Sequence, residues 1–551
     1  MLMNKFLLRS NQMKKFHPLS IICSLFFIYS CSENISPVDS GLEDKIFHFG
    51  NGTEPQGIDP HIVTGVPEHH LLIGLCEGLT TANPKGGSSI AGAAESWDIS
   101  EDGKTYTFYL QKNGRWSNGD QLTAHDFVWS WKRLLTPSLG AQYPDMLYYV
   151  VGAEEYHTQS NSKISFDTVG VKALDDLTLQ VTLNEPTPFF LGLLSHYSTW
   201  PVHKDTVLKH GSIDDRNGEW TRPGNFVCNG AFNLKTWELN NKIVVEKNPM
   251  YWDASTVQLN EIHYYPVSNV MTEDRMFRSG QLHVTSTLPS QKCPVYIEEQ
   301  NPNLRIDPYM GTYFYRFNTN NPALVDPKVR KALAYSINRT QIVERVTKCG
   351  QIPAYSFTPP GSNGYEPDTA IPYDPELGLK LLKEAGYDEN NPFPKLEILF
   401  NTNEDHRKVA LAIQQMWQQN LGIEVELVNQ DWKVYLNREM IGDFQVSRAG
   451  WIGDYEDPNT FLDLLRPNRG NNKTGWGNPE YDRLVQLANT KVDQTERYEL
   501  LMQAERILID EMPIIPLYTY VRVYQLSGDV KGYYPNYLDH HHPKYFYLER
   551  D

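Results

Sequence analysis

Residues 448–458 are the part of the sequence best suited to ligand chemistry. They read Arg448-Ala449-Gly450-Trp451-Ile452-Gly453-Asp454-Tyr455-Glu456-Asp457-Pro458, at a predicted strand-to-turn junction. Glycine lets a backbone approach a ligand closely. An aromatic ring beside a partly buried carboxylate lowers the local dielectric and strengthens the attraction of that carboxylate for a cation. The segment therefore indicates a cation-binding carboxylate, and the alternative is a surface turn whose tryptophan covers the core.

Motifs typical of enzymes and of metal or nucleotide sites are missing from the sequence. There is no GxSxG elbow, no Walker loop, no GxGxxG after a predicted strand and no HExxH. No pair of carboxylates stands out as a glycosidase pair. The histidine runs His69-His70 and His540-His541-His542 could bind a metal, but we expect the second to lie on the surface near the terminus without one. No catalytic residue, metal site or cofactor is predicted.

Composition describes a globular chain with several domains' worth of core. The 551 residues include 50 Lys plus Arg and 67 Asp plus Glu, which gives a net charge of −17. This charge, without a basic run, argues against nucleic acid as a partner, because a polyphosphate would be repelled. The 32 Tyr, 22 Phe and 12 Trp residues suit either a large aromatic core or a cleft for polar ligands.

The N-terminus is typical of an export signal. Lys14 and Lys15 precede an apolar run over residues 19–28 that is shorter than the roughly 20 residues of a membrane span. The run ends in Ile28-Tyr29-Ser30-Cys31, which resembles the lipobox of bacterial lipoproteins. We expect residues 1–30 to be a signal peptide, Cys31 to carry lipid and 31–43 to be a flexible tether. The alternative is a plain secretory signal.

Four further cysteines leave two alternatives open. Cys76, Cys228, Cys293 and Cys349 are scattered and lack CxxC spacing, so a metal cluster is not expected. In an oxidising compartment they could form two disulfides, whose pairing the sequence does not reveal, or remain free buried thiols.

Helix and strand patterns interleave along the chain. Alternating apolar residues predict strands near 105–110 and 177–183, with a short apolar strand at 243–245. Proline-containing caps at Asp326-Pro327 and Asp374-Pro375 predict helix starts. Further patterns predict strands at 396–400 and 423–427, a helix over 409–420 and a helix after an Asp493–Glu496 capping box. The mixture favours an α/β fold.

A series of motifs accompanies the 448–458 segment in a fixed order. They are Ala94-Glu95-Ser96-Trp97-Asp98, Trp116-Ser117-Asn118-Gly119-Asp120, 123–131, Asn229-Gly230-Ala231-Phe232, Asn248-Pro249-Met250-Tyr251-Trp252, Arg278-Ser279-Gly280, 353–360 and Asn429-Gln430-Asp431-Trp432-Lys433. In this order they resemble the peptide-binding proteins of bacterial ABC importers, which belong to the peptide/nickel solute-binding family 5. The likeness covers about residues 45–551.

The resemblance implies a two-lobed periplasmic-binding-protein-like fold of type II, large cluster C, with an extra subdomain on lobe I. Lobe I would comprise residues 44–77, 204–310 and 522–551. The extra subdomain would be 78–203, and lobe II would be 311–521. Hinge strands would lie near 305–315 and 515–525, and the lobes would close over the ligand.

The resemblance also implies roles for individual residues. Asp454 resembles the anchor for the peptide ammonium, and Tyr143 would touch the peptide main chain near that end. The other implied contacts are Thr64, Gly65 and Val66 as a strand-like edge, Gly450, Trp451 and Ile452 as a second edge, Trp432 and Trp451 as pocket walls, and Arg448, His406 and Arg438 as basic residues of the cleft.

Three departures from enteric relatives concern the same cleft. Glu439 stands where the family has a second cleft arginine, with Arg438 beside it, and Thr64 replaces an acidic residue. Gly311 and Ile452 stand where those relatives have a cysteine pair. The carboxyl end of the ligand and the preferred ligand length are therefore expected to differ.

The expected function is capture of short peptides in an interlobe cleft and delivery to an ABC permease. We expect a monomer in the periplasm or at the outer face of the cytoplasmic membrane, held to the membrane only by lipid at Cys31. Alternatives are the same fold tuned to murein tripeptide, dipeptide, haem or a nickel chelate, an adhesin or chaperone-like protein, and, in a different class, a secreted carboxylate-dependent hydrolase.

Overall fold

The computed structural model describes residues 35–159, 163–467 and 469–550, and residues 36–551 form one compact unit. Cys31 and the predicted signal peptide lie outside the described residues. No helix within the described ranges is long and apolar enough to cross a membrane.

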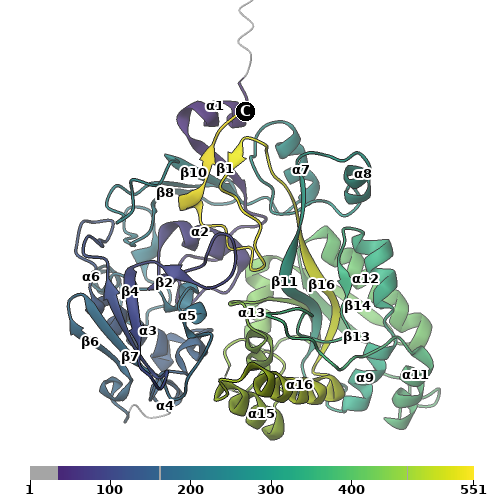
Figure 1. Ribbon diagram of the computed structural model, residues 1–551. Coiled ribbons are helices and arrows are strands. Elements are labelled where there is room, and N and C mark those ends of the chain that lie inside the picture. The colour runs from purple at the N-terminus through teal and green to yellow at the C-terminus, as the bar shows by residue number, and fades with distance from the viewer. Residues whose placement is uncertain (1–34, 160–162, 468, 551) are drawn as a thin grey trace, which may run out of the picture. The chain divides into compact units, whose positions relative to one another are not determined.

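A six-stranded sheet forms the half of the molecule at the right of Figure 1. Its strands, in spatial order, are β12 (Ile352–Pro353), β16 (Ile514–Gln525), β11 (Leu304–Phe317), β15 (Val446–Ile452), β13 (Leu396–Asn401) and β14 (Val425–Gln430). Strand β13 is buried on both faces. Ile398 and Phe400 pack in the core that contains α12 (Glu404–Leu421), while Leu399 packs against Tyr435 of α13 (Trp432–Met440).

Helix caps read from the sequence begin the helices around this sheet. Asp326, Asp374 and Asp493 are the N-caps of α9 (Pro327–Tyr335), α11 (Pro375–Glu384) and α16 (Gln494–Glu511), and each side chain accepts a backbone N–H of the first turn. Helix α12 ends at Gly422 in the left-handed conformation, with φ of 71°. The predicted helices are confirmed, and α15 (Pro479–Asn489) packs against α16.

Two four-stranded sheets form the other half. In the first, β1 (Ile46–Gly50) pairs in parallel with β10 (Glu261–Tyr265), followed by β9 (Lys242–Lys247) and β8 (Phe232–Glu238). The second is antiparallel and contains β4 (Ala94–Ile99), β5 (Thr105–Leu110), β7 (Thr178–Thr182) and β6 (Val171–Asp175). The predicted strands are confirmed. Tyr106, Phe108 and Leu110 are buried while their neighbours are more exposed, which explains the alternation.

Other helices surround these sheets. They are α2 (Val66–Leu75), α3 (Ala124–Leu135), α4 (Ala153–Thr158), α5 (Phe190–Leu193), α6 (Lys204–Lys209), α7 (Val270–Arg278), α8 (Cys293–Glu298), α10 (Arg339–Ile342) and α14 (Asn459–Leu462). Helix α3 packs on β6 and β7, with Phe127, Trp131 and Leu134 fully buried.

Strands β11 and β16 are the longest pair in the molecule. They run antiparallel from the Leu304–Gln525 pair to the Arg316–Ile514 pair. Figure 1 shows them passing from the neighbourhood of β1, β10 and α7 into the six-stranded sheet. They coincide with the two segments expected to be hinge strands.

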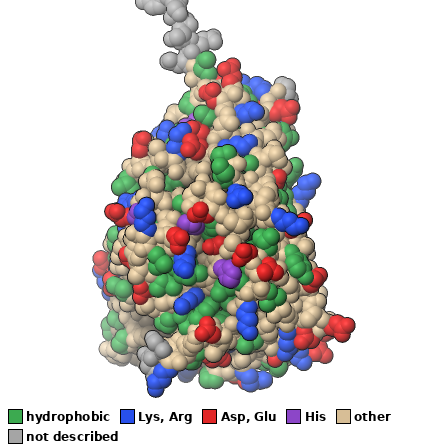
Figure 2. All heavy atoms as spheres, turned by 90° about the vertical axis from the view of Figure 1, so that its left-hand side faces the viewer, with side chains coloured by type: hydrophobic (Ala, Val, Ile, Leu, Met, Phe, Trp, Pro, Cys, Tyr) green, Lys and Arg blue, Asp and Glu red, His purple; other side chains and the backbone are tan. Residues whose placement is uncertain are grey.

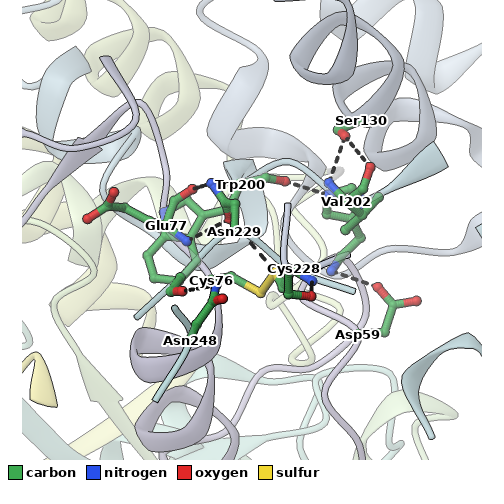
Figure 3. The surroundings of a disulfide bond; sticks show 12 residues. Asp59, Cys76, Glu77, Ser130, Trp200, Val202, Cys228, Asn229 and Asn248 are labelled. Atoms are coloured by element: carbon green, nitrogen blue, oxygen red, sulfur yellow. Dashed lines mark hydrogen bonds between the residues drawn. A yellow bond between two sulfur atoms is a disulfide. The ribbon is translucent and has the colours of Figure 1, made fainter. Parts of the chain in front are cut away.

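The four remaining cysteines form two disulfides. Cys76 follows α2 and bonds Cys228, which precedes β8 (Figure 3). Cys293 begins α8 and bonds Cys349, which follows the π-helix Val343–Thr347. The structure thus selects disulfides over free thiols.

The tether prediction is wrong for residues 37–43. These residues belong to helix α1 (Pro37–Asp44), whose N-cap Ser36 accepts the N–H of Asp39. The helix is fastened to the body, because Val38 N donates to Gly280 O at 2.9 Å and Asp39 pairs with Arg550 at 2.8 Å. A serine followed by proline occurs both at the start of helices and in flexible linkers. Here the contacts with the rest of the molecule stabilise the helix.

The expectation of a surface histidine run is also wrong. His540, His541 and His542 are only 7%, 8% and 4% exposed. His541 Nε2 lies 2.7 Å from Asp539, and His542 Nε2 lies 3.1 Å from the hydroxyl of Thr81. This segment folds back into the interior, which proximity to a terminus does not reveal.

Candidate functional site

Asp454 is a carboxylate with no cationic side chain paired to it among the described residues. It lies two residues beyond β15, its side chain is 11% exposed, and its backbone N–H donates to Thr460 Oγ1 at 3.1 Å. His196 lies beside its oxygens, with Nε2 3.5 Å from Oδ1. Burial, and then the charge of Asp145, hold the pKa of Asp454 well above its ordinary value. Such a group favours an incoming cation.

Aromatic rings from three parts of the chain surround this carboxylate. The ring of Tyr143 lies 4.6 Å from that of His196, 6.1 Å from that of Tyr197 and 6.2 Å from that of Trp451. Burial, and then the charge of Asp454, raise the pKa of Tyr143 and of Tyr197. Trp451 Nε1 donates to Thr460 O at 2.8 Å, so its ring is fixed as a wall. The predicted residues Asp454, Tyr143 and Trp451 therefore lie together.

Strand β15 has an unpaired edge beside this carboxylate. It pairs with β11 as far as Ile452, but the described pairing with β13 stops at Ser447. Gly453 N donates to Met310 O of β11, so the alternate residues Gly450 and Ile452 direct their backbone groups toward the other edge. That edge offers main-chain hydrogen bonds to an added extended segment.

The opposite wall comes from the start of α2. Gly65 is its N-cap in extended conformation, and a Cβ there would lie 2.1 Å from Glu68 Oε2 and 3.1 Å from Trp432 Cζ2. Glycine thus leaves room for the Glu68 carboxylate and lets the Trp432 ring approach, with half-buried Thr64 next to it. The expectation of a strand-like edge is wrong for Val66, which begins the helix and is 42% exposed.

Arg448 and His406 form a second, basic cluster. The Arg448 guanidinium lies 4.7 Å from the ring centre of Tyr313 and donates to Tyr520 Oη at 2.9 Å. His406 Nδ1 lies 3.4 Å from Tyr313 Oη. Burial, and then the charge of Arg448, lower the pKa of His406 well below its ordinary value. Arg448 has no carboxylate paired to it within the described ranges, so the cluster is suited to an anion.

Arg438 does not join either cluster. Its guanidinium pairs with Glu397 and with Asp443, at 2.9 Å each, on a groove lined also by Lys395 and Gln445. The neighbouring Glu439 is buried against Arg316, with 3.5 Å between Nε and Oε1. One turn of α13 therefore directs these two side chains to different surroundings.

Three residues of the Asp454 surroundings escaped the sequence reasoning. His196 and Tyr197 begin a short 3₁₀ turn, and Asp145 lies two residues after Tyr143. They approach Asp454 only through tertiary folding, from more than 250 positions away in the sequence. No local pattern around them differs from that of an ordinary turn.

Residues 90–473 match the family model of bacterial extracellular solute-binding proteins, family 5. The periplasmic oligopeptide-binding protein OppA of Salmonella typhimurium is 39% identical over 490 residues, covering 88% of each chain. The crystal structure of Haemophilus influenzae OppA in complex with RPPGFSPFR has a TM-score of 0.87 and 35% identity, covering 92% of this chain and 99% of that one. The predicted fold class is confirmed.

Two structures of one relative, one of them in an open form, differ in how well they match the present structure. The Escherichia coli murein tripeptide binding protein MppA, 33% identical, gives a TM-score of 0.87 over 92% of this chain and 99% of that chain. Its unliganded open form gives 0.62 over 92% and 98%. The present structure is therefore unlike the open form, in keeping with the contact between Gly65 and Trp432. The chain belongs to family 5 of the bacterial extracellular solute-binding proteins and is a binding protein rather than an enzyme.

Proposed function

We propose that this protein captures short peptides between two lobes and delivers them to an ABC permease for import. The observation that carries the proposal is Asp454, a carboxylate 11% exposed, without a cationic partner in the described part of the chain and next to the free edge of β15. A peptide supplies both missing partners, because its ammonium is a cation and its main chain is an extended ladder of donors and acceptors.

The opposite end of a peptide carries a carboxylate. Arg448, with its Nε buried and unpartnered, and His406 beside it offer the complementary site. The ligand-binding roles of Asp454, Tyr143, Gly450, Trp451, Ile452, Thr64, Gly65, Trp432, Arg448 and His406 are part of this proposal, and Val66 is left out because it begins helix α2. Arg438 is left out, because its two ion pairs already satisfy it.

The lobes of the proposal follow the sheets. Lobe I takes residues 44–77, 204–310 and 522–551, with 78–203 as its extra subdomain, and lobe II takes 311–521. Strands β11 and β16 are the hinges, because both long strands connect the two halves. Ligand would favour the closed arrangement by contacting both lobes.

The proposed location is the periplasm or the outer face of the cytoplasmic membrane, with lipid at Cys31 as the anchor and a monomer as the working form. Relatives named as periplasmic oligopeptide-binding proteins support the compartment.

Figure 2 shows acidic and basic side chains interspersed on one face of the molecule, without a broad basic patch.

Calorimetry on the refolded protein tests the proposal. Denaturation removes any co-purified ligand, and mass spectrometry identifies that ligand. We expect tri- to pentapeptides with a free amino terminus to bind and their N-acetylated forms to bind at least about tenfold more weakly, because a buried carboxylate is left unpaired. Absence of binding by all of them would refute it. Preferential binding of murein tripeptide, dipeptide, haem or a nickel chelate would change the proposed ligand but not the family. Turnover of peptides would indicate a hydrolase.

A further inference from the structure

The protonation pattern of His196 is fixed by its own turn. His196 is the N-cap of the 3₁₀ turn Tyr197–Thr199, and its Nδ1 accepts the backbone N–H of Ser198 at 3.3 Å. A backbone amide only donates, and the hydroxyl of Ser198, whose Oγ lies 2.9 Å from the same nitrogen, can donate to it as well, so Nδ1 serves as the acceptor of the neutral imidazole. The proton therefore sits on Nε2, the atom 3.5 Å from Asp454 Oδ1.

The surroundings of His196 hold that ring in place and keep it uncharged. The rings of Tyr197 and Tyr143 lie 4.1 Å and 4.6 Å from it, and its side chain is 3% exposed. Burial, and then the nearby charge of His540, lower the pKa of His196 to about 3. At neutral pH the histidine is therefore a donor without a positive charge.

We propose that His196 is a positioning residue for ligand recognition, a neutral donor that orients the Asp454 carboxylate without neutralising it. This inference rests on the proposed function. A lysine or arginine in its place would satisfy the carboxylate internally and compete with the ligand's ammonium. An apolar residue would leave the carboxylate free to rotate. A neutral histidine avoids both, so the charged form of the carboxylate is left for a cation of the ligand to stabilise.

The test compares two dissociation constants for each variant of the full chain. One peptide has a free amino terminus and the other is its N-acetyl form, and their ratio measures recognition of the ammonium. We expect His196→Ala to lower this ratio about tenfold or more, since the Nε2 donor 3.5 Å from the carboxylate is lost. Affinity for the N-acetyl peptide should stay unchanged. His196→Gln, which keeps a donor near the position of Nε2, should restore most of the ratio, and His196→Lys should lower it furthest.

His203 provides a matched control. It is also an N-cap, its Nδ1 accepts the N–H of Thr206 at 3.3 Å, and its Nε2 lies 3.1 Å from the exposed Asp120. His203→Ala therefore removes the same capping interaction and should leave the ratio unchanged. An unchanged ratio in His196→Ala, or equal weakening of both peptides, would overturn the inference. If the unmodified protein binds neither peptide or does not distinguish them, the proposed function itself fails.

Discussion

Glu77 and Asp454 are two carboxylates withdrawn from solvent, and their surroundings differ in one respect. The Glu77 side chain is 5% exposed and receives Lys544 Nζ at 2.6 Å, Trp252 Nε1 at 2.6 Å and Tyr251 Oη at 2.7 Å. Asp454 is 11% exposed and has no Lys or Arg partner among the described residues; a neutral imidazole lies 3.5 Å from it, with the like charge of Asp145 nearby. The first charge is compensated by an ammonium within the protein, whereas the second has no such partner in the portion that the structure describes.

The Glu77 site is built from family motifs. Asn229, in the Asn229–Phe232 motif, bonds both the N–H and the C=O of Glu77, and Tyr251 and Trp252 come from the 248–252 motif. Figure 3 shows Glu77 and Asn229 next to the disulfide of Cys76 and Cys228. Motifs that identify the family thus assemble a buried support around Glu77, whereas the proposed ammonium anchor, Asp454, lies elsewhere.

Removing the charge at Glu77 is the strongest way to test its structural role. In Glu77→Gln the ammonium of Lys544, 6% exposed, is left buried without its anion. We expect the free energy of unfolding to fall by about 3–5 kcal/mol. Urea denaturation measures this fall. Peptide affinity of the folded fraction should be preserved, and a loss of binding at unchanged stability would reverse the roles assigned to the two carboxylates.

The matched control is Glu185→Gln. Glu185 pairs with Lys104 at 2.8 Å, but both side chains are solvent-accessible, at 49% and 33%. An exposed pair contributes at most about 1 kcal/mol, so this change should barely move the urea midpoint.

The second prediction concerns Asp454→Asn. The amide is similar in size but carries no charge, so the ammonium of a bound peptide would lose its partner. We expect the binding free energy to weaken by about 2–5 kcal/mol, measured by calorimetry with a free tripeptide. Glu456→Gln is the control, because Glu456 lies two residues away and its Oε2 accepts the N–H of Gly87 at 3.2 Å. Equal affinities in the unmodified protein and Asp454→Asn would remove the proposed anchor.

The contrast between the two sites explains what the sequence predicts. Helix starts at Asp326 and Asp374 and the alternation in β5 are local, and they were predictable because a cap or a pleat depends on near neighbours. The glycine- and aromatic-rich segment 448–458 indicated a carboxylate, but the choice of Asp454 among its acids came from the resemblance to the family. The position of His196 beside Asp454 was not predictable, because the two residues are far apart in the sequence. The pairing of Arg438 with Glu397 was missed for the same reason.

The smallest expected effect is a gain in stability from Asp454→Asn. Because the pKa of Asp454 is raised in the folded protein, its neutral form stabilises the ligand-free fold below its ordinary pKa, and that contribution is lost as the pH rises through the raised pKa. The asparagine variant has no ionisation penalty. We therefore expect the ligand-free variant to be more stable at neutral pH by about 1–3 kcal/mol, the cost of a buried unsatisfied group.

This difference in the free energy of unfolding should shrink toward zero near pH 4. Urea denaturation of both ligand-free proteins across this pH range measures it. A gap that is constant with pH would mean that Asp454 ionises normally, and the contrast with Glu77 would then lie in hydrogen bonding alone.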